Sequence, residues 1–86
     1  MAKHNLTVEI SGGDEISVHG DEAGLQFLVD HLQRLLDSTK PGHFNHEHLN
    51  TEDWGGDELN STLLSDSAKL INHVRLYCWK GSKSQI

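Results

Sequence analysis

A single leucine-rich stripe is the strongest structural signal in this chain of 86 residues. Apolar residues recur at spacings of three and four between Leu25 and Leu36, the pattern of one face of an α-helix of about 16 residues. Asp21 precedes this segment as the expected N-cap, and residues 38–42 contain the Pro and Gly that end it. An amphipathic helix must be covered, so the rest of the chain has to supply a sheet or a partner surface.

Alternation of apolar and polar residues predicts strands on both sides of this helix. The period is two in residues 5–10 and again in residues 16–18 after a Gly-Gly turn, which indicates a β-hairpin. Beyond the helix, residues 44–49 suit a short strand or an ordered loop, and residues 69–79 suit one long, central final strand. We therefore expect a two-layer α+β fold in β-β-α-β-β order, with the helix packed on a mainly antiparallel sheet of four to five strands. A parallel crossover from the second strand to the third is an open alternative.

The length allows one small domain. We expect residues 1–86 to form it, with an ordered core at about 4–79 and a frayed polar tail at 80–86. Seven Lys and Arg against 13 Asp and Glu give a net charge of −6 without a basic stripe, which argues against a nucleic-acid partner. No apolar run approaches the ~20 residues of a membrane span. Because residues 1–5 lack the apolar segment of a secretory signal and the chain has one cysteine, we expect a cytoplasmic protein.

Histidines cluster in residues 43–48. On a strand, His46 and His48 project from the same face, at a spacing that lets two imidazoles share one metal ion. One alternative is therefore a small zinc-binding domain built on this pair, with His43 nearby. Its further ligands would come from His73, Cys78, Asp53 and Asp57. In the other alternative the histidines are half-buried sheet residues bonded to neighbouring groups, and no cofactor is expected.

An acidic run with one tryptophan follows at residues 52–58. Its composition is typical of an interface that faces a basic partner, unless Trp54 folds back over the small core. The outer side of the last strand offers a second candidate surface, unless residues 43–49 or a second subunit cover it; it comprises His73, Arg75, Tyr77 and Trp79. The chain lacks a nucleophile-elbow or phosphate-loop motif, so we expect no catalysis. The candidate partner-binding residues are His46, His48, Glu52, Asp53, Trp54, Asp57 and Glu58.

The leucine helix, the segment His46-Glu47-His48-Leu49 and the run from Asp53 to Leu59 together resemble immunity protein family 32, over about residues 5–76. These small proteins are encoded beside the toxins of bacterial polymorphic toxin systems. In this resemblance His46, His48 and Leu49 form the signature, and Trp54, Gly55 and Gly56 the motif that follows it. It implies a protein that binds and neutralises a cognate toxin without catalysis of its own. The acidity suits a basic toxin such as a nuclease. A homodimer that pairs through its last strand or outer face remains a further alternative.

Overall fold

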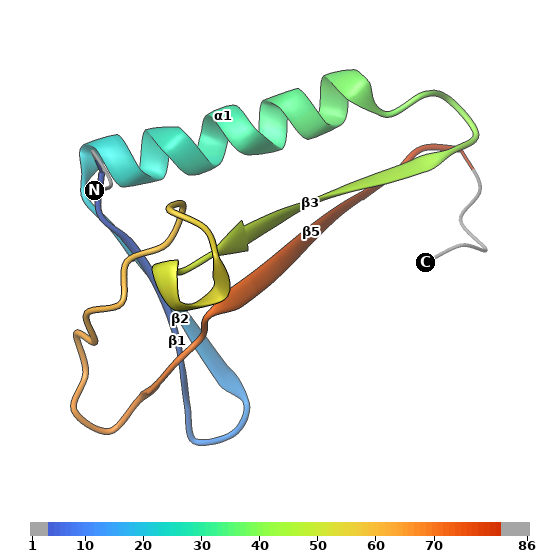
Figure 1. The fold of residues 1–86 in the computed structure, drawn as a ribbon. Helices are drawn as coiled ribbons and strands as arrows, with labels where there is room; N and C mark the ends of the chain where they lie inside the picture. Colours follow the sequence, from blue (N-terminus) through green and yellow to red (C-terminus); the bar gives the residue numbers. More distant parts are fainter. Residues whose placement is uncertain (1–3, 82–86) are drawn as a thin grey trace.

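The computed structural model describes residues 4–81, so the expected frayed tail lies mostly outside the described residues. It confirms an α+β fold with one helix and five strands (Figure 1). The elements are β1 (Leu6–Ser11), β2 (Glu15–Gly20), α1 (Glu22–Ser38), β3 (Phe44–Asn50), the 3₁₀ turn η1 (Glu52–Trp54), β4 (Lys69–Leu70) and β5 (His73–Trp79). All pairings between these strands are antiparallel, so the alternative of a parallel crossover is not realised among them.

The strands divide between two sheets, where the sequence suggested one. The first sheet has the order β2-β1-β4, and the second consists of β3 and β5. In the second sheet the register runs from Phe44 opposite Trp79 to Asn50 opposite His73. Figure 1 shows α1 running along the paired strands β3 and β5, with the β1–β2 hairpin projecting away from the start of the helix.

The prediction of one long, central strand at residues 69–79 is wrong. β4 pairs with β1, whereas β5 pairs with β3 in the other sheet, and the chain crosses between the sheets at Ile71 and Asn72. Asn72 fixes this crossing, because its backbone oxygen accepts the N–H of Thr51 at 3.0 Å and its Oδ1 accepts the Thr51 hydroxyl at 2.6 Å. A period of two predicts extended backbone, and it cannot show that the pairing partner changes halfway along.

The start of α1 is fixed to the start of β1. Asp21 caps the helix as expected: its Oδ1 accepts the N–H of Gly24 at 2.7 Å, and its Oδ2 accepts the Asn5 side-chain amide at 2.8 Å. These bonds, with the Gly24 N–H as the strongest, lower the pKa of Asp21. Gly24 lies so close to the strand that an added Cβ would be 1.8 Å from the backbone oxygen of Asn5. The junction therefore requires glycine for space, although its φ is not in the left-handed region.

The core is small and open on one side. Leu6, Val8, Leu49 and Leu59 form its buried centre, and Leu35 of α1 is buried as well. Partly buried apolar side chains pack around this centre: Phe27, Leu28, Ile71, Val74 and Leu76. An apolar groove of about 390 Å³ lies between the two sheets beneath Leu28. Ile16 and Val18 of β2 line this groove and are exposed, so the core is not fully covered on their side.

A buried carboxylate holds the long loop at residues 60–68 over the outer face of β1. Glu9 is only 1% exposed, and its Oε2 accepts the backbone N–H groups of Leu64 and Ser65. His19 Nε2 lies 3.2 Å from the other oxygen, in an electrostatic contact without hydrogen-bond geometry. The pKa of Glu9 is lowered, and the hydrogen bond from the Leu64 N–H is the largest cause. Burial acts in the opposite direction and raises the pKa, but it does not outweigh the hydrogen bonds.

Candidate functional site: a face of stacked rings

The register of β3 and β5 places an unusual set of side chains on one face of the second sheet. Because alternate residues of a strand share a face, Phe44, His46 and His48 of β3 lie beside alternate residues of β5. Trp54 of η1 extends this face at one end, where it contacts His73. We call the resulting surface the ring face; its members are Phe44, His46, His48, Trp54, His73, Tyr77 and Trp79. The two candidate surfaces predicted from the sequence are thus one continuous surface.

The aromatic end of the ring face is formed by Phe44, Tyr77 and Trp79. Phe44 stacks on Trp79 with ring centroids 4.7 Å apart, and Tyr77 lies 6.3 Å from Trp79. Tyr77 also stacks on His46 at 5.4 Å, which joins this end to the imidazoles. Both Phe44 and Tyr77 are exposed, so residues 43–49 lie beside the outer side of β5 without covering it. Flat rings held this way offer large contact areas at a low entropic cost.

The other end of the ring face carries three imidazoles and an indole. The rings of His46 and His48 are 5.0 Å apart, and the rings of His48 and His73 are stacked at 5.0 Å. Nδ1 of His48 and Nε2 of His73 are 2.8 Å apart, a distance at which one ring donates and the other accepts. The series ends at Trp54, whose ring lies 5.4 Å from His73. Since an accepting ring must be neutral, this geometry describes a face on which at least one imidazole of the pair is uncharged.

The surroundings of His48 disfavour its protonation. Desolvation is the main cause of its lowered pKa, and the positive charges of His46, His73 and Arg75 add to it. Around neutral pH His48 is therefore uncharged. Of the three groups whose positive charge lowers the pKa of His48, Arg75 is the one that is permanently charged, and it lies opposite His48 in the register. The ring face is consequently a surface of uncharged rings at neutral pH around one exposed permanent cation, Arg75, and it gains further positive charge in mild acid.

Trp54 is 58% exposed, which favours the interpretation of this residue as a contact residue over one in which it covers the core. The acidic side chains around it differ in their surroundings. Glu52, Asp53 and Asp57 are exposed, whereas Glu58 is half-buried and accepts the Asn50 N–H at 2.9 Å. Glu58 therefore holds the turn against β3, while the other three carboxylates are available to a partner.

The two glycines after Trp54 serve the geometry of this turn. Gly55 has a φ of 86°, in the left-handed region, and closes η1 by donating its N–H to the oxygen of Glu52. A Cβ at Gly56 would lie 2.7 Å from the Cβ of Asn50, so only glycine lets the turn pack against β3. The Trp-Gly-Gly motif thus supports the exposed position of Trp54.

The remaining candidate residues lie elsewhere. Leu49 points into the core and is 1% exposed, so the signature His-x-His-Leu combines two outward imidazoles with one core residue. His43 is exposed and contributes its backbone, whose oxygen accepts the Lys80 N–H at 2.9 Å. Cys78 pairs with Asn45 on the opposite side of the sheet from the ring face. Within residues 4–81 no group of three or more His, Cys, Asp or Glu side chains is placed to hold a metal ion.

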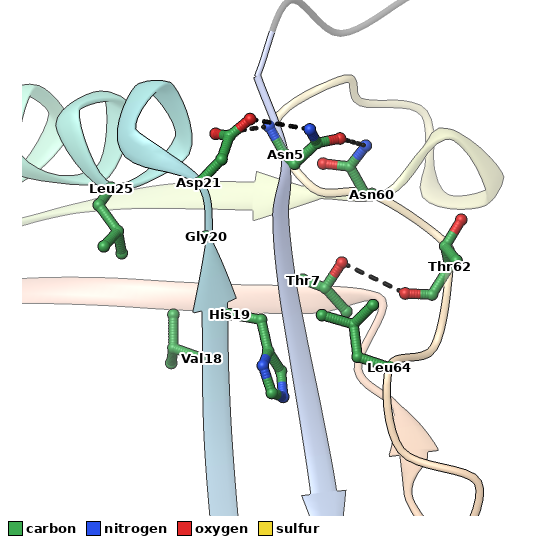
Figure 2. Close-up of a pocket in the computed structure, with 10 residues that line it drawn as sticks. All are labelled: Asn5, Thr7, Val18, His19, Gly20, Asp21, Leu25, Asn60, Thr62 and Leu64. Atoms are coloured by element: carbon green, nitrogen blue, oxygen red, sulfur yellow. Dashed lines mark hydrogen bonds between the residues drawn. The ribbon is translucent and has the colours of Figure 1, made fainter.

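A depression of about 620 Å³ near the helix start, lined by both polar and apolar side chains, has a structural role (Figure 2). Its polar groups bind each other: Asn60 donates its amide to Asn5 Oδ1 at 3.4 Å, and the Thr7 hydroxyl donates to the oxygen of Thr62 at 3.4 Å. Asp21 serves as the helix cap. These bonds tie the loop to β1, so this depression is a junction between elements.

No described helix is long and apolar enough to cross a membrane.

Comparison with known proteins identifies the class to which this fold and surface belong. The family described as Immunity protein 32 matches residues 15–74, from the first residue of β2 into β5. The chain belongs to this family, as its resemblance indicated. The match includes His46, His48 and the Trp-Gly-Gly motif, whereas Tyr77 and Trp79 lie beyond it. No curated protein and no solved structure matches the chain.

Proposed function

We propose that this protein binds and neutralises a cognate bacterial toxin in the cytoplasm of the cell that makes it, without catalysis of its own. The observation that carries this proposal is the ring face, with Trp54 exposed beside three available carboxylates. Tryptophan and tyrosine are the side chains most often found at the energetic centre of protein interfaces. Membership of an immunity family is consistent with such a use of the surface.

The chemistry of the ring face fits a basic partner. Exposed ring faces attract Lys and Arg side chains through cation–π contacts. The net charge of −6, together with Glu52, Asp53 and Asp57 next to Trp54, accelerates the encounter with a positively charged protein. A nuclease toxin has such a basic surface where it holds phosphates, and an inhibitor that occupies it would block substrate entry.

The proposal is tested with the toxin encoded next to the gene for this protein. Co-expression is expected to rescue growth, and the purified pair is expected to form a complex on size exclusion. Trp54→Ala should weaken that complex by tenfold or more, because truncation of an interface tryptophan typically costs about 2 kcal/mol or more. Leu63→Ala is the matched control, since Leu63 is also exposed but lies in the loop at residues 60–68. Absence of rescue and of a complex, or equal effects of the two variants, would contradict the proposal.

Acidification offers a second test of the same surface. Protonation of all seven imidazoles changes the formal charge from −6 to +1, and three of these imidazoles lie on the ring face. A complex with a basic toxin should therefore weaken as the pH falls from 7.5 toward 5. His46→Asn with His48→Asn should reduce this pH dependence, and an affinity that does not change with pH would show that these histidines do not face the partner.

A further inference from the structure

A second surface, separate from the ring face, lies on α1. Two of the six residues in the leucine-rich stripe pack inward: Leu28 and the buried Leu35. The other four face solvent and are between 42% and 54% exposed: Leu25, Val29, Leu32 and Leu36. We call these four residues the α1 seam. Four large aliphatic side chains aligned on one helix face are more than the scattered exposed apolar residues of an ordinary surface.

The spacing of the α1 seam is that of a helix that packs against another helix. Its residues follow one another by four, three and four positions, the narrow repeat of a coiled-coil contact. This spacing reads the same in both directions, with its centre between Asp30 and His31. In an antiparallel pair of identical helices, Leu25 then faces Leu36 of the second copy and Val29 faces Leu32. The α1 seam is thus complementary to itself across a two-fold axis.

Charge favours the antiparallel arrangement. Glu22 lies in the first turn of α1, and Lys40 follows the last turn. An antiparallel pair brings Glu22 of each copy near Lys40 of the other, and it opposes the two helix dipoles. A parallel pair would place two Glu22 carboxylates together. Next to the α1 seam the helix surface carries the neutral amides Gln26 and Gln33, which do not repel a second copy.

The apolar surface continues from the α1 seam to the open side of the core. Leu25 and Val18 line the same depression, and Val18 with Ile16 also lines the apolar groove between the sheets. At exposures of 42–60%, these six residues leave on the order of 500 Å² of surface per copy. A dimer that covers all six residues in both copies buries about 1,000 Å², which is at the lower end of specific interfaces.

We propose that this protein is a homodimer in which the α1 seams of two copies pack antiparallel across a two-fold axis. A second copy of the chain is available wherever the protein is made. It can therefore cover this apolar surface before the protein meets a toxin. The pairing differs from one through the last strand or the outer face of the sheet, and it leaves the ring face of each copy free. It does not depend on the proposed function.

Sedimentation of the full chain over the micromolar range tests the proposal. The unmodified protein should sediment as a dimer that dissociates on dilution, and Leu32→Lys should weaken dimerisation by tenfold or more. Leu63→Lys is the matched control, because it makes the same change at a leucine of nearly equal exposure, 43% against 42%. Circular dichroism verifies that both variants are folded. A monomer at every concentration, or a Leu32→Lys variant that dimerises as the unmodified chain does, would overturn the proposal.

Disulfide cross-linking tests the orientation. In a Cys78→Ser background, a mixture of the Leu25→Cys and Leu36→Cys chains should form cross-linked dimers on oxidation, and Leu25→Cys alone should form few. The reverse result would overturn the antiparallel arrangement. If the unmodified chain is monomeric and Leu32→Lys instead abolishes the toxin complex, the α1 seam belongs to the toxin and the homodimer is refuted.

Discussion

The contact between Gly24 and β1 permits a sharp prediction, because two physical effects act there with opposite sign. Alanine is the better helix former by about 1 kcal/mol, so propensity alone predicts that Gly24→Ala stabilises α1. The new Cβ would lie 1.8 Å from the backbone oxygen of Asn5, below the 3.0 Å that real Cβ contacts respect. The helix start must therefore move by more than 1 Å away from β1. That shift also breaks the bond from the Asp21 N–H to the Asn5 oxygen, now 3.2 Å long.

These contributions can be combined. Forcing atoms into a packed site costs ~2 kcal/mol, the lost backbone hydrogen bond costs ~1 kcal/mol, and the gain in propensity returns ~1 kcal/mol. Gly24→Ala should therefore destabilise the protein by about 2 kcal/mol, which lowers the Tm of a domain of this size by about 8–16 °C. Thermal and urea unfolding followed by circular dichroism measure both quantities.

The neighbouring exposed residue supplies the control. Ala23→Gly changes propensity alone and should cost about 1 kcal/mol, less than Gly24→Ala. Propensity by itself predicts the opposite order of the two variants. A Gly24→Ala protein with a Tm equal to or above that of the unmodified chain would refute the close packing of the helix start on β1.

Three further predictions concern charged groups. The pKa of Glu9 is lowered in the folded state, so the ionised carboxylate contributes fully to stability above the unfolded pKa, near 4.5. This contribution is lost as the pH falls through the lowered folded pKa. The urea midpoint should therefore decline less steeply in acid for Glu9→Gln than for the exposed control Glu15→Gln. The pKa of His48 is lowered, so an NMR titration should place its midpoint below 6.5, and His46→Asn should move it upward, while an unchanged midpoint would contradict the contact between these rings. The Arg34 guanidinium donates to both oxygens of Glu47 at 3.2 and 3.3 Å, and its side chain is 60% exposed. A double-mutant cycle should therefore give a weak coupling energy that fades with added salt, and a coupling energy insensitive to salt would contradict this.

Local elements of the fold were predictable because their determinants lie close together in the sequence. The spacing of leucines, the Asp21 cap and the Gly-Gly turn each act within a few residues, and the structure confirms the helix and the first hairpin. The division into two sheets depends on side-chain bonds between Thr51 and Asn72, which are 21 positions apart. Neither periodicity nor composition carries such information. The same holds for Glu9, which has the position of an outward polar residue until the loop at residues 60–68 covers it.

The candidate site was predicted in pieces. Alternation placed His46 and His48 on one face, and composition drew attention to Trp54, but their union into one surface depends on the register between β3 and β5. Phe44 shares this alternation with His46 and His48, but it was not a predicted contact residue, because a single aromatic residue at the start of a strand carries no motif. Glu58 shows the converse, since it belongs to the acidic run by sequence and is bound within the turn in the structure. Which of the exposed candidates contact a toxin stays a prediction.

The two indoles of this chain occupy opposite ends of the ring face, and this gives the protein two built-in optical reporters. Trp54 lies against an imidazole, whereas Trp79 is stacked on Phe44. Indole emission responds to water and to the protonation of an adjacent imidazole, so the two signals differ in their response to acid. Trp54→Phe and Trp79→Phe chains would each retain one of these fluorophores. Emission shifts in such single-tryptophan chains can show, without any attached dye, which end of the surface a bound protein covers.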